Sequence, residues 1–258
     1  MRLALFTPYG AMQREAGMVA LLANYLQKSG AEAVQLRCDG AQRACARDAL
    51  SAGGRTPFTC SPCIAEQSAL AQWGGIKAKG ISSFVAAEDV ERITAWLDSV
   101  PGDQLFRSEF RGASLWDACR HSFLFRWQLA GGEELSALQQ ENLRGLFISY
   151  MHVRIAAERF IAAMKPSLHF VAGPDDAAVQ AYLAEAKAAG AEGAMFSFNS
   201  DDETVVVEQL ASAQRYETRL VLEGVASMRS DPRTWAPEVT AVVHEILSFL
   251  GYAPDRVI

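Results

Sequence analysis

The first 37 residues combine two kinds of apolar pattern, and few folds accommodate both. Residues 2–7 are a short apolar run that ends in the turn Pro8-Tyr9-Gly10, and residues 33–36 are a second apolar run. Between the runs, apolar side chains recur at helical spacing at Met12, Ala16, Val19, Ala23 and Leu26. Gly30 stands where such a helix would end. A strand, a helix and a second strand in this order form the unit that builds a parallel sheet.

The same alternation continues to the end of the chain. We expect helices at about 64–73, 88–99, 115–129, 142–164, 175–189 and 237–250. We expect strands at 168–172, 193–198, 204–209 and 219–223, the last two as an antiparallel pair. On the helix at 88–99, Val90, Ile93 and Leu97 should share the buried face, and the apolar stripe of 143–164 should lie against the sheet. The sequence therefore predicts one α/β domain over residues 1–258, Rossmann-like, with a mainly parallel sheet and helical embellishment.

Charge and hydropathy restrict the partners. Half of the 258 residues are hydrophobic, as expected for a chain that buries a core, and the formal net charge of −6 argues against a nucleic-acid binder. No stretch reaches the roughly 20 apolar residues of a membrane span. We expect a cytoplasmic protein. A basic group could bind a phosphorylated small molecule such as a nucleotide-sugar, but a solvated, ion-paired face is the favoured interpretation. This group consists of Arg107, Arg111, Arg120 and Arg126.

Four of the five cysteines fall within 26 residues, in a segment rich in glycine and proline at about 38–75. Cys38 and Cys45 form C-x6-C, fourteen residues follow, and Cys60 and Cys63 form C-x2-C. The second spacing suits two thiolates on one ion, whereas the first is wider than usual. Four thiolates suit tetrahedral zinc or an iron–sulfur cluster. We predict an insertion that binds metal through these four residues, with zinc favoured and iron–sulfur as the alternative.

Two other interpretations of the cysteines stay open. Cys60-Ser61-Pro62-Cys63 is predicted to open a helix, where the dipole would lower a thiol pKa and allow a redox-active dithiol. Alternatively, the four cysteines are unrelated to one another. Cys119 stands apart in an aromatic segment and is predicted to be a small buried hydrophobe.

Ligand-binding residues are expected in loops that follow strands, because open α/β sheets bind ligands beyond the carboxyl ends of their strands. Thr7 and Gly10 follow the first strand, and Arg229, Asp231 and Arg233 lie between a predicted strand and the last helix. A packed connecting loop explains the second group equally well. The four histidines form no paired ligand pattern, and no catalytic residue is assigned.

Two passages resemble a known family. Residues 36–45 (LRCDGAQRAC), with the later Cys60-x-x-Cys63, resemble the N-terminal part of glycosyltransferase-like proteins from bacterial capsule and surface-polysaccharide clusters. The long helix at 142–164, followed by Lys165-Pro166 and the strand to Val171, looks like a passage of the same family. The resemblance spans residues 1 to about 172. It implies a Rossmann-like domain and a role in carbohydrate assembly.

The resemblance does not extend to a donor site. Two-domain transferases of this type hold the donor nucleotide largely in a second Rossmann domain, and the 86 residues after position 172 suffice only to complete one sheet. We therefore expect a glycosyltransferase-like protein of cell-surface carbohydrate biosynthesis with a four-cysteine metal centre, with or without transferase activity. The alternatives are an iron–sulfur or thiol redox protein and a non-catalytic scaffold stabilised by zinc.

Overall fold

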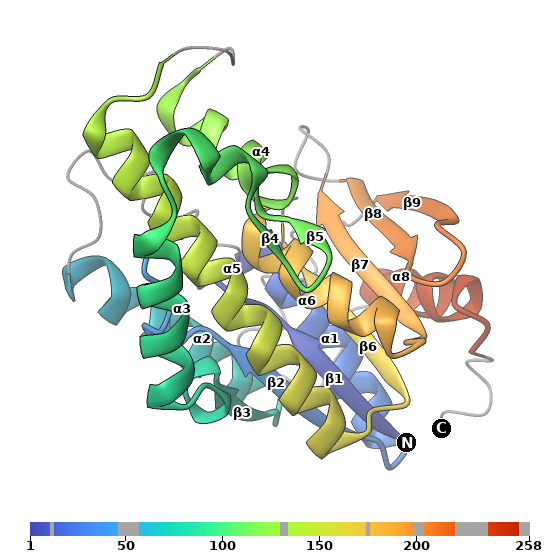
Figure 1. The fold of residues 1–258 in the computed structure, drawn as a ribbon. Helices are drawn as coiled ribbons and strands as arrows, with labels where there is room; N and C mark the ends of the chain where they lie inside the picture. Colours follow the sequence, from blue (N-terminus) through green and yellow to red (C-terminus); the bar gives the residue numbers. More distant parts are fainter. Residues whose placement is uncertain are drawn as a thin grey trace.

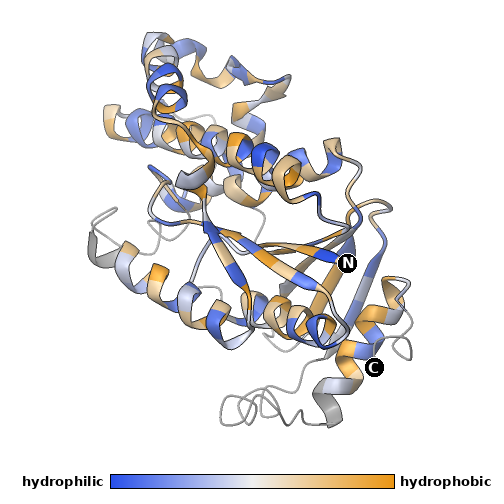
Figure 2. Cartoon of the chain, turned by 90° about the horizontal axis from the view of Figure 1, so that it is seen from below, coloured by the Kyte–Doolittle hydropathy of each residue, from blue (hydrophilic) through white to orange (hydrophobic). Residues whose placement is uncertain are grey.

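The computed structural model describes residues 1–10, 13–45, 57–129, 134–173, 176–198, 204–219 and 237–252. Within these ranges seven strands form one sheet with helices on both faces (Figures 1 and 2). The strands are β1 (Arg2–Phe6), β2 (Glu32–Arg37), β3 (Lys77–Gly80), β6 (Leu168–Ala172), β7 (Gly193–Phe198), β8 (Thr204–Gln209) and β9 (Arg215–Arg219). Their order across the sheet is β3-β2-β1-β6-β7-β8-β9.

The sheet is mainly parallel, as predicted. β1 pairs in parallel with β2 and β6, and the parallel pairing extends to β3 on one side and β7 on the other. β8 and β9 add antiparallel strands at the far edge. The strand predicted at 219–223 instead begins at Arg215, because a tight turn connects it to β8: the Gln209 N–H donates to the Gln214 carbonyl at 2.9 Å. Residues 220–223 lie outside the described ranges.

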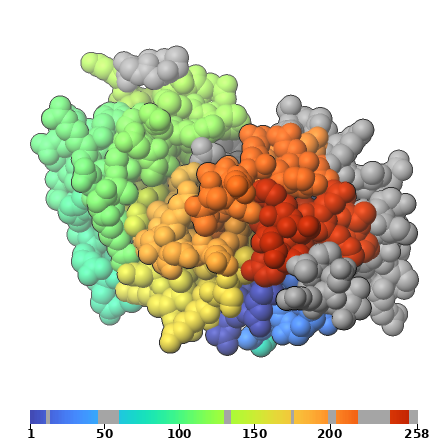
Figure 3. Space-filling view, turned by 90° about the vertical axis from the view of Figure 1, so that its right-hand side faces the viewer, coloured from blue at the N-terminus to red at the C-terminus, as the bar shows by residue number. Residues whose placement is uncertain are grey.

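Two helical layers cover the sheet. The helices are α1 (Gln13–Lys28), α2 (Pro57–Trp73), α3 (Ala87–Ser99), α4 (Leu115–Trp127), α5 (Ala137–Met164), α6 (Ala177–Ala188) and α8 (Pro237–Phe249). α3, α4, α5 and α6 share one hydrophobic core with one face of the sheet. α1 and α8 share a second core with the opposite face, and α2 contacts α1 (Figure 2). Figure 3 shows α8 beside β8 and β9, where Tyr216 donates to Glu245 at 3.0 Å.

The connection between β2 and β3 is more regular than predicted. The sequence suggests an irregular insertion at 38–75 with a short helix from about Ile64. In the structure α2 already begins at Pro57 and leads to β3, which pairs in parallel with β2. The C-terminal half of the cysteine-rich segment is therefore the crossover helix of a strand–helix–strand unit. β3 itself was not predicted.

Between β3 and α4 the chain forms small elements that the sequence analysis does not predict. They are two 3-10 helices, η2 (Ile81–Phe84) and η3 (Gly102–Arg107), and a hairpin of β4 (Glu109–Phe110) and β5 (Ala113–Ser114). The hairpin turn contains Arg111, whose φ of 53° is in the left-handed region. These elements lie on the side of the sheet that α3–α6 cover, and they extend that layer.

The apolar stripe of α5 packs against the sheet, as predicted. Phe147, Tyr150 and Phe160 lie in the same buried core as Phe6 of β1 and Val171 of β6. The helix begins five residues earlier than predicted, at Ala137, because the Ser136 hydroxyl caps it by accepting from the Gln139 N–H. α5 is buried on nearly all sides between residues 145 and 157, and this stretch includes the polar side chains of Ser149, His152 and Arg154.

On α3 the predicted buried face is only partly correct. Ile93 and Leu97 are buried, but Val90 is 38% exposed and Asp89 takes the inward position. Arg159 of α5 and Arg92 pair with the Asp89 carboxylate, and this compensates the burial of its charge. The Arg159 guanidinium is the largest cause that holds the pKa of Asp89 below its ordinary value.

A membrane-spanning helix is not found among the described residues. Even α5, with 28 residues, lacks an apolar window of sufficient length and hydropathy.

Candidate functional site

The loops that follow β1 and β2 meet the N-terminal half of α2 at the carboxyl edge of the parallel strands. Thr7 directly follows β1, and Cys38 directly follows β2. The Gly10 N–H donates to the Cys63 sulfur of α2 at 3.1 Å. The structure therefore brings together two predicted ligand-binding residues and two predicted metal-binding cysteines, which the sequence analysis treats as separate groups. This edge is where α/β sheets bind ligands.

Cys63 is buried, and its sulfur accepts two hydrogen bonds. One donor is the Gly10 N–H, and the other is the Gln67 side-chain amide, one helical turn further along α2, at 3.6 Å. The same amide group also donates to the Cys38 carbonyl at 3.3 Å. Gln67 therefore connects the helix that carries one cysteine to the loop that carries the other.

The loop after β2 curls around the sulfur of Cys38. The backbone N–H groups of Gly40 and Gln42 bond to this sulfur, and Gly40 allows the curl because its φ is 94°, in the left-handed region. Burial nevertheless raises the pKa of the Cys38 thiol above its ordinary value. The N–H groups oppose that rise in pKa, while Asp39 and Cys63 add to it. The Gln67 amide, which reaches both the Cys38 carbonyl and the Cys63 sulfur, places these two residues next to each other.

Cys45 and Cys60 are half-buried and take different positions. Cys45 packs against the core beside Ala44, whose N–H donates to the Ser149 hydroxyl of α5 at 2.9 Å. Cys60 lies in the first turn of α2. Within the described ranges, no three Cys, His, Asp or Glu side chains lie close enough together to hold a metal ion. The four predicted ligands do not form one ligand set here.

The prediction that Cys60-Ser61-Pro62-Cys63 opens a helix is wrong in its boundary. α2 begins at Pro57, so Pro62 and Cys63 lie inside the helix. The Cys63 sulfur, inside the helix, accepts hydrogen bonds from the Gly10 N–H and the Gln67 amide.

Thr7 and Gly10 have structural roles at the site. The Thr7 hydroxyl is buried and accepts a hydrogen bond from the Gln35 amide of β2. Gly10 lies directly against α2: a Cβ at this position would stand 2.3 Å from the Cys63 carbonyl oxygen and 2.9 Å from Glu66 Cβ. Only glycine therefore allows the loop after β1 to approach the Cys63 sulfur this closely.

We expect Gly10→Ala to push the loop after β1 away from α2 and to remove the N–H···S bond. Overpacking of this kind costs about 1–3 kcal/mol in the free energy of unfolding, measured by denaturant titration. Gly17→Ala is the matched control, because no atom outside its own helix lies within 4 Å of a Cβ there. That variant should gain up to about 1 kcal/mol as a helix-interior Gly→Ala change. Equal effects of the two changes would contradict the packing described for Gly10.

The other predicted ligand residues are not part of this site. Arg229, Asp231 and Arg233 lie outside the described ranges. Within the basic group, Arg111 pairs with Glu158 and Glu185, and Arg120 lies 3.8 Å from Asp117. These two arginines therefore belong to an ion-paired face. Cys119 is fully buried, as predicted, and burial raises the pKa of its thiol.

The sequence assigns no role to three polar residues at this site. Gln42 is buried, and its side-chain oxygen accepts from the Tyr9 hydroxyl at 3.3 Å. His152 of α5 is buried, and burial is the main cause that lowers its pKa, while the backbone of Ala41 opposes that shift. Gln67 is the third. Its helical spacing of four residues from Cys63 is a signal that could have identified it, whereas nothing in the sequence marks His152 or Gln42.

No family model matches the chain, and no curated protein matches it. The resemblance to glycosyltransferase-like proteins therefore stays a prediction from the sequence. The arrangement of Gly10, Cys38, Cys63 and Gln67 at the carboxyl edge is the observation on which a functional proposal can rest.

Proposed function

We propose that the protein holds a thiolate-bound metal centre at the carboxyl edge of its sheet, with zinc as the favoured metal and an iron–sulfur cluster as the alternative. Cys38 and Cys63 are its central ligands, and Cys45 and Cys60 complete the set. One observation supports this most strongly: the two neighbouring sulfurs each accept two N–H hydrogen bonds. Donors of this kind orient ligands and stabilise negative charge on sulfur in metal sites.

Burial favours a metal centre over a redox role for the Cys38–Cys63 pair. A redox-active cysteine is partly exposed and has a low pKa, since the thiolate is the attacking species. Here Cys63 is 8% exposed, and burial raises the pKa of Cys38. A buried thiol under these conditions keeps its proton unless a cation takes the proton's place. Metal binding supplies that cation and releases the protons.

The softness and number of the sulfur ligands agree with zinc and with iron–sulfur clusters. Completing the set requires Cys45 and Cys60 to approach the Cys38–Cys63 pair. Cys45 follows the loop that curls around Cys38, and Cys60 lies one helical turn before Cys63. In such sites the free energy of metal binding is also free energy of folding, so ligand closure and metal uptake occur together.

The test is metal analysis of the full chain purified anaerobically under reducing conditions. We expect about one zinc per chain bound tetrahedrally, as in structural zinc sites. Iron with acid-labile sulfide and an absorbance near roughly 400 nm would identify the iron–sulfur alternative. Neither metal in the reduced protein would contradict the proposal. A Cys60–Cys63 disulfide that cycles with reductant would support the redox interpretation in its place.

A role in carbohydrate assembly is our second proposal. It is supported by the position of the site beyond the carboxyl ends of β1 and β2, where α/β sheets bind ligands. Thermal unfolding with nucleotides and nucleotide-sugars tests it, and binding should raise Tm by mass action. If none of them raises Tm, the zinc-stabilised scaffold replaces the glycosyltransferase-like role.

A further inference from the structure

The crossover helix α2 contains a proline in its interior. Pro62 is the sixth residue of this helix, which begins at Pro57. A proline has no N–H, so the bond from residue 62 to the Phe58 carbonyl that a regular helix contains cannot form, and the ring crowds that carbonyl. Pro57 does not have this effect, because the first N–H of a helix has no helical partner in any case. The turn before Pro62 is therefore bonded less firmly to the rest of α2 than a regular turn.

This weak point separates two of the proposed metal ligands. Cys60 lies before Pro62, and Cys63 follows it directly. The backbone N–H groups of residues 63–65 bond to the turn that contains Cys60, and they are the helical bonds that still cross Pro62. Rotation of the first turn about Pro62 breaks these bonds alone, and it leaves Cys63 in place.

Contacts with other elements hold Cys63 and Cys38. The Cys63 sulfur accepts from the Gly10 N–H at 3.1 Å, and the loop after β1 lies so close that only glycine fits at position 10. Cys38 directly follows β2, and its carbonyl accepts from the Gln67 amide at 3.3 Å. Both residues therefore belong to the rigid part of the site.

Cys45 is anchored through its neighbour Ala44. The Ala44 N–H donates to the Ser149 hydroxyl of α5 at 2.9 Å, and Ala44 is 4% exposed. Gly145 of α5 leaves room for this approach, since a Cβ there would stand 3.3 Å from the Ala44 Cβ. The described contacts thus fix the backbone at three of the cysteines, whereas Cys60 lies on the turn that Pro62 weakens.

We infer that Pro62 is a hinge, and that residues 57–61 swing about it to bring Cys60 onto a metal ion held by the other cysteines. The inference rests on the proposed function for the metal, while the weak point in α2 follows from Pro62 itself. Hinges in switching proteins are a few residues near the end of an element that absorb the change in φ and ψ. Metal favours the closed turn because this turn supplies one more thiolate than the open turn does. Cys60 is then the last ligand to bind and the first to leave.

The first experiment is hydrogen exchange of the full chain, stripped of metal by a chelator under reducing conditions. It compares the amides of residues 63–65, which bond across Pro62, with those of residues 67–71 in the following turns of the same helix. The former should exchange faster in the wild type. In Pro62→Ala this ratio should fall by about tenfold or more, because alanine restores the missing bond and is the best helix former. Pro57→Ala is the matched control and should leave the ratio unchanged.

The second experiment is zinc titration of the same proteins. Zinc should slow exchange at residues 63–65 in the wild type, because the closed turn holds Cys60 on the metal. Cys60→Ser should lose this slowing. Pro62→Ala retains all four cysteines, yet its apparent zinc affinity should fall by about the factor by which its hinge opens less, since a less populated binding-competent state weakens binding in proportion. Pro57→Ala should bind zinc as the wild type does.

The two measurements separate failure of the hinge from failure of the metal centre. Equal exchange ratios in the wild type and Pro62→Ala would overturn the hinge. A lower ratio in Pro62→Ala with unchanged zinc affinity would overturn its role in closing the ligand set. If the wild type binds neither zinc nor iron, the metal centre is wrong and the closing motion with it, while the exchange ratio still shows whether Pro62 weakens α2.

Discussion

Replacement of Cys63 by serine is expected to release the proposed metal and to loosen residues 38–75. A serine hydroxyl is a poor ligand for a soft metal. The change also removes the sulfur atom that accepts hydrogen bonds from the Gly10 N–H and the Gln67 amide. At a free metal concentration of 100–1,000 times Kd, loss of binding removes about 3–4 kcal/mol from the free energy of unfolding. The measurement is metal content by elemental analysis together with denaturant unfolding. Cys38→Ser should behave in the same way.

Cys119→Ala is the control for this prediction. Cys119 is fully buried on α4, and its sulfur lies 4.0 Å from the Leu146 carbonyl, in contact with α5. Its replacement should reduce stability by packing loss alone and leave the metal content unchanged. Hydrogen exchange should show the loosening in Cys63→Ser confined to residues 38–75, while the strands of the sheet stay protected. Full metal retention in both Cys38→Ser and Cys63→Ser would contradict the assigned ligands.

The fold was predictable where burial produces a periodic sequence. β1, β2 and β6 are buried parallel strands with apolar runs, and α1 and α5 have apolar stripes of helical period. β3, with the sequence KAKG, has no apolar run because it is a four-residue edge strand with alternating exposed positions. Its place in the sheet comes from pairing with β2, and periodicity contains no signal for such pairing.

The site was predictable in its residue types and not in its geometry. Spacing pairs Cys60 with Cys63, yet the structure places Cys38 beside Cys63, because a loop after β2 and a helix meet at the sheet edge. Loop curvature of this kind depends on backbone conformation, as at Gly40, and spacing does not record it. Gln67 was missed since glutamine on a helix usually faces solvent. It is buried here, and its amide bonds to the Cys38 carbonyl and the Cys63 sulfur.

Glu185→Ala is expected to cause the largest loss of stability outside the cysteine site, about 3–5 kcal/mol in the free energy of unfolding, as for a broken buried ion pair. Glu185 of α6 bonds to Arg154 of α5, and their side chains are 10% and 8% exposed. Arg154 also donates to the Tyr150 hydroxyl at 3.1 Å. Removal of the carboxylate would leave the Arg154 guanidinium buried without a compensating charge. Thermal and denaturant unfolding measure the loss.

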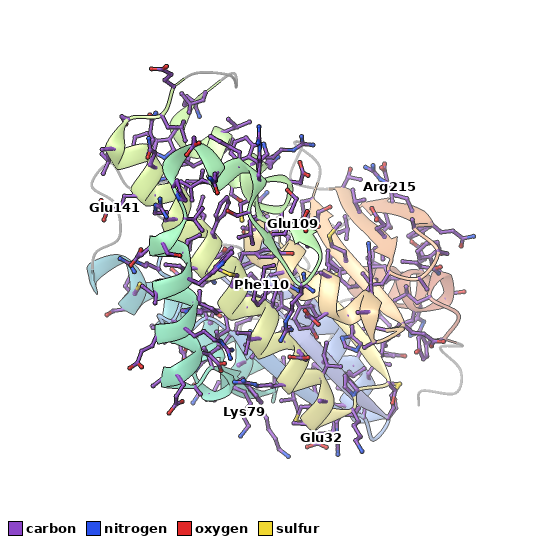
Figure 4. All side chains as sticks on the ribbon, in the orientation of Figure 1. Glu32, Lys79, Glu109, Phe110, Glu141 and Arg215 are labelled. Atoms are coloured by element: carbon purple, nitrogen blue, oxygen red, sulfur yellow. The ribbon has the colours of Figure 1, made fainter. Side chains whose placement is uncertain are left out.

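Glu158 offers a matched comparison, because Arg111 of the β4–β5 hairpin bonds to both carboxylates, to Glu185 at 3.3 Å and to Glu158 at 2.7 Å. Figure 4 labels Glu109 and Phe110 of this hairpin. The Glu158 side chain is 51% exposed, so Glu158→Ala should cost no more than about 1 kcal/mol. The double change Arg154→Met with Glu185→Leu should recover most of the stability lost in Glu185→Ala, since it removes both buried charges. If Glu185→Ala and Glu158→Ala have equal effects, burial does not determine the strength of this ion pair. If the double variant is as unstable as Glu185→Ala, the loss comes from packing between α5 and α6 and not from the unpaired charge.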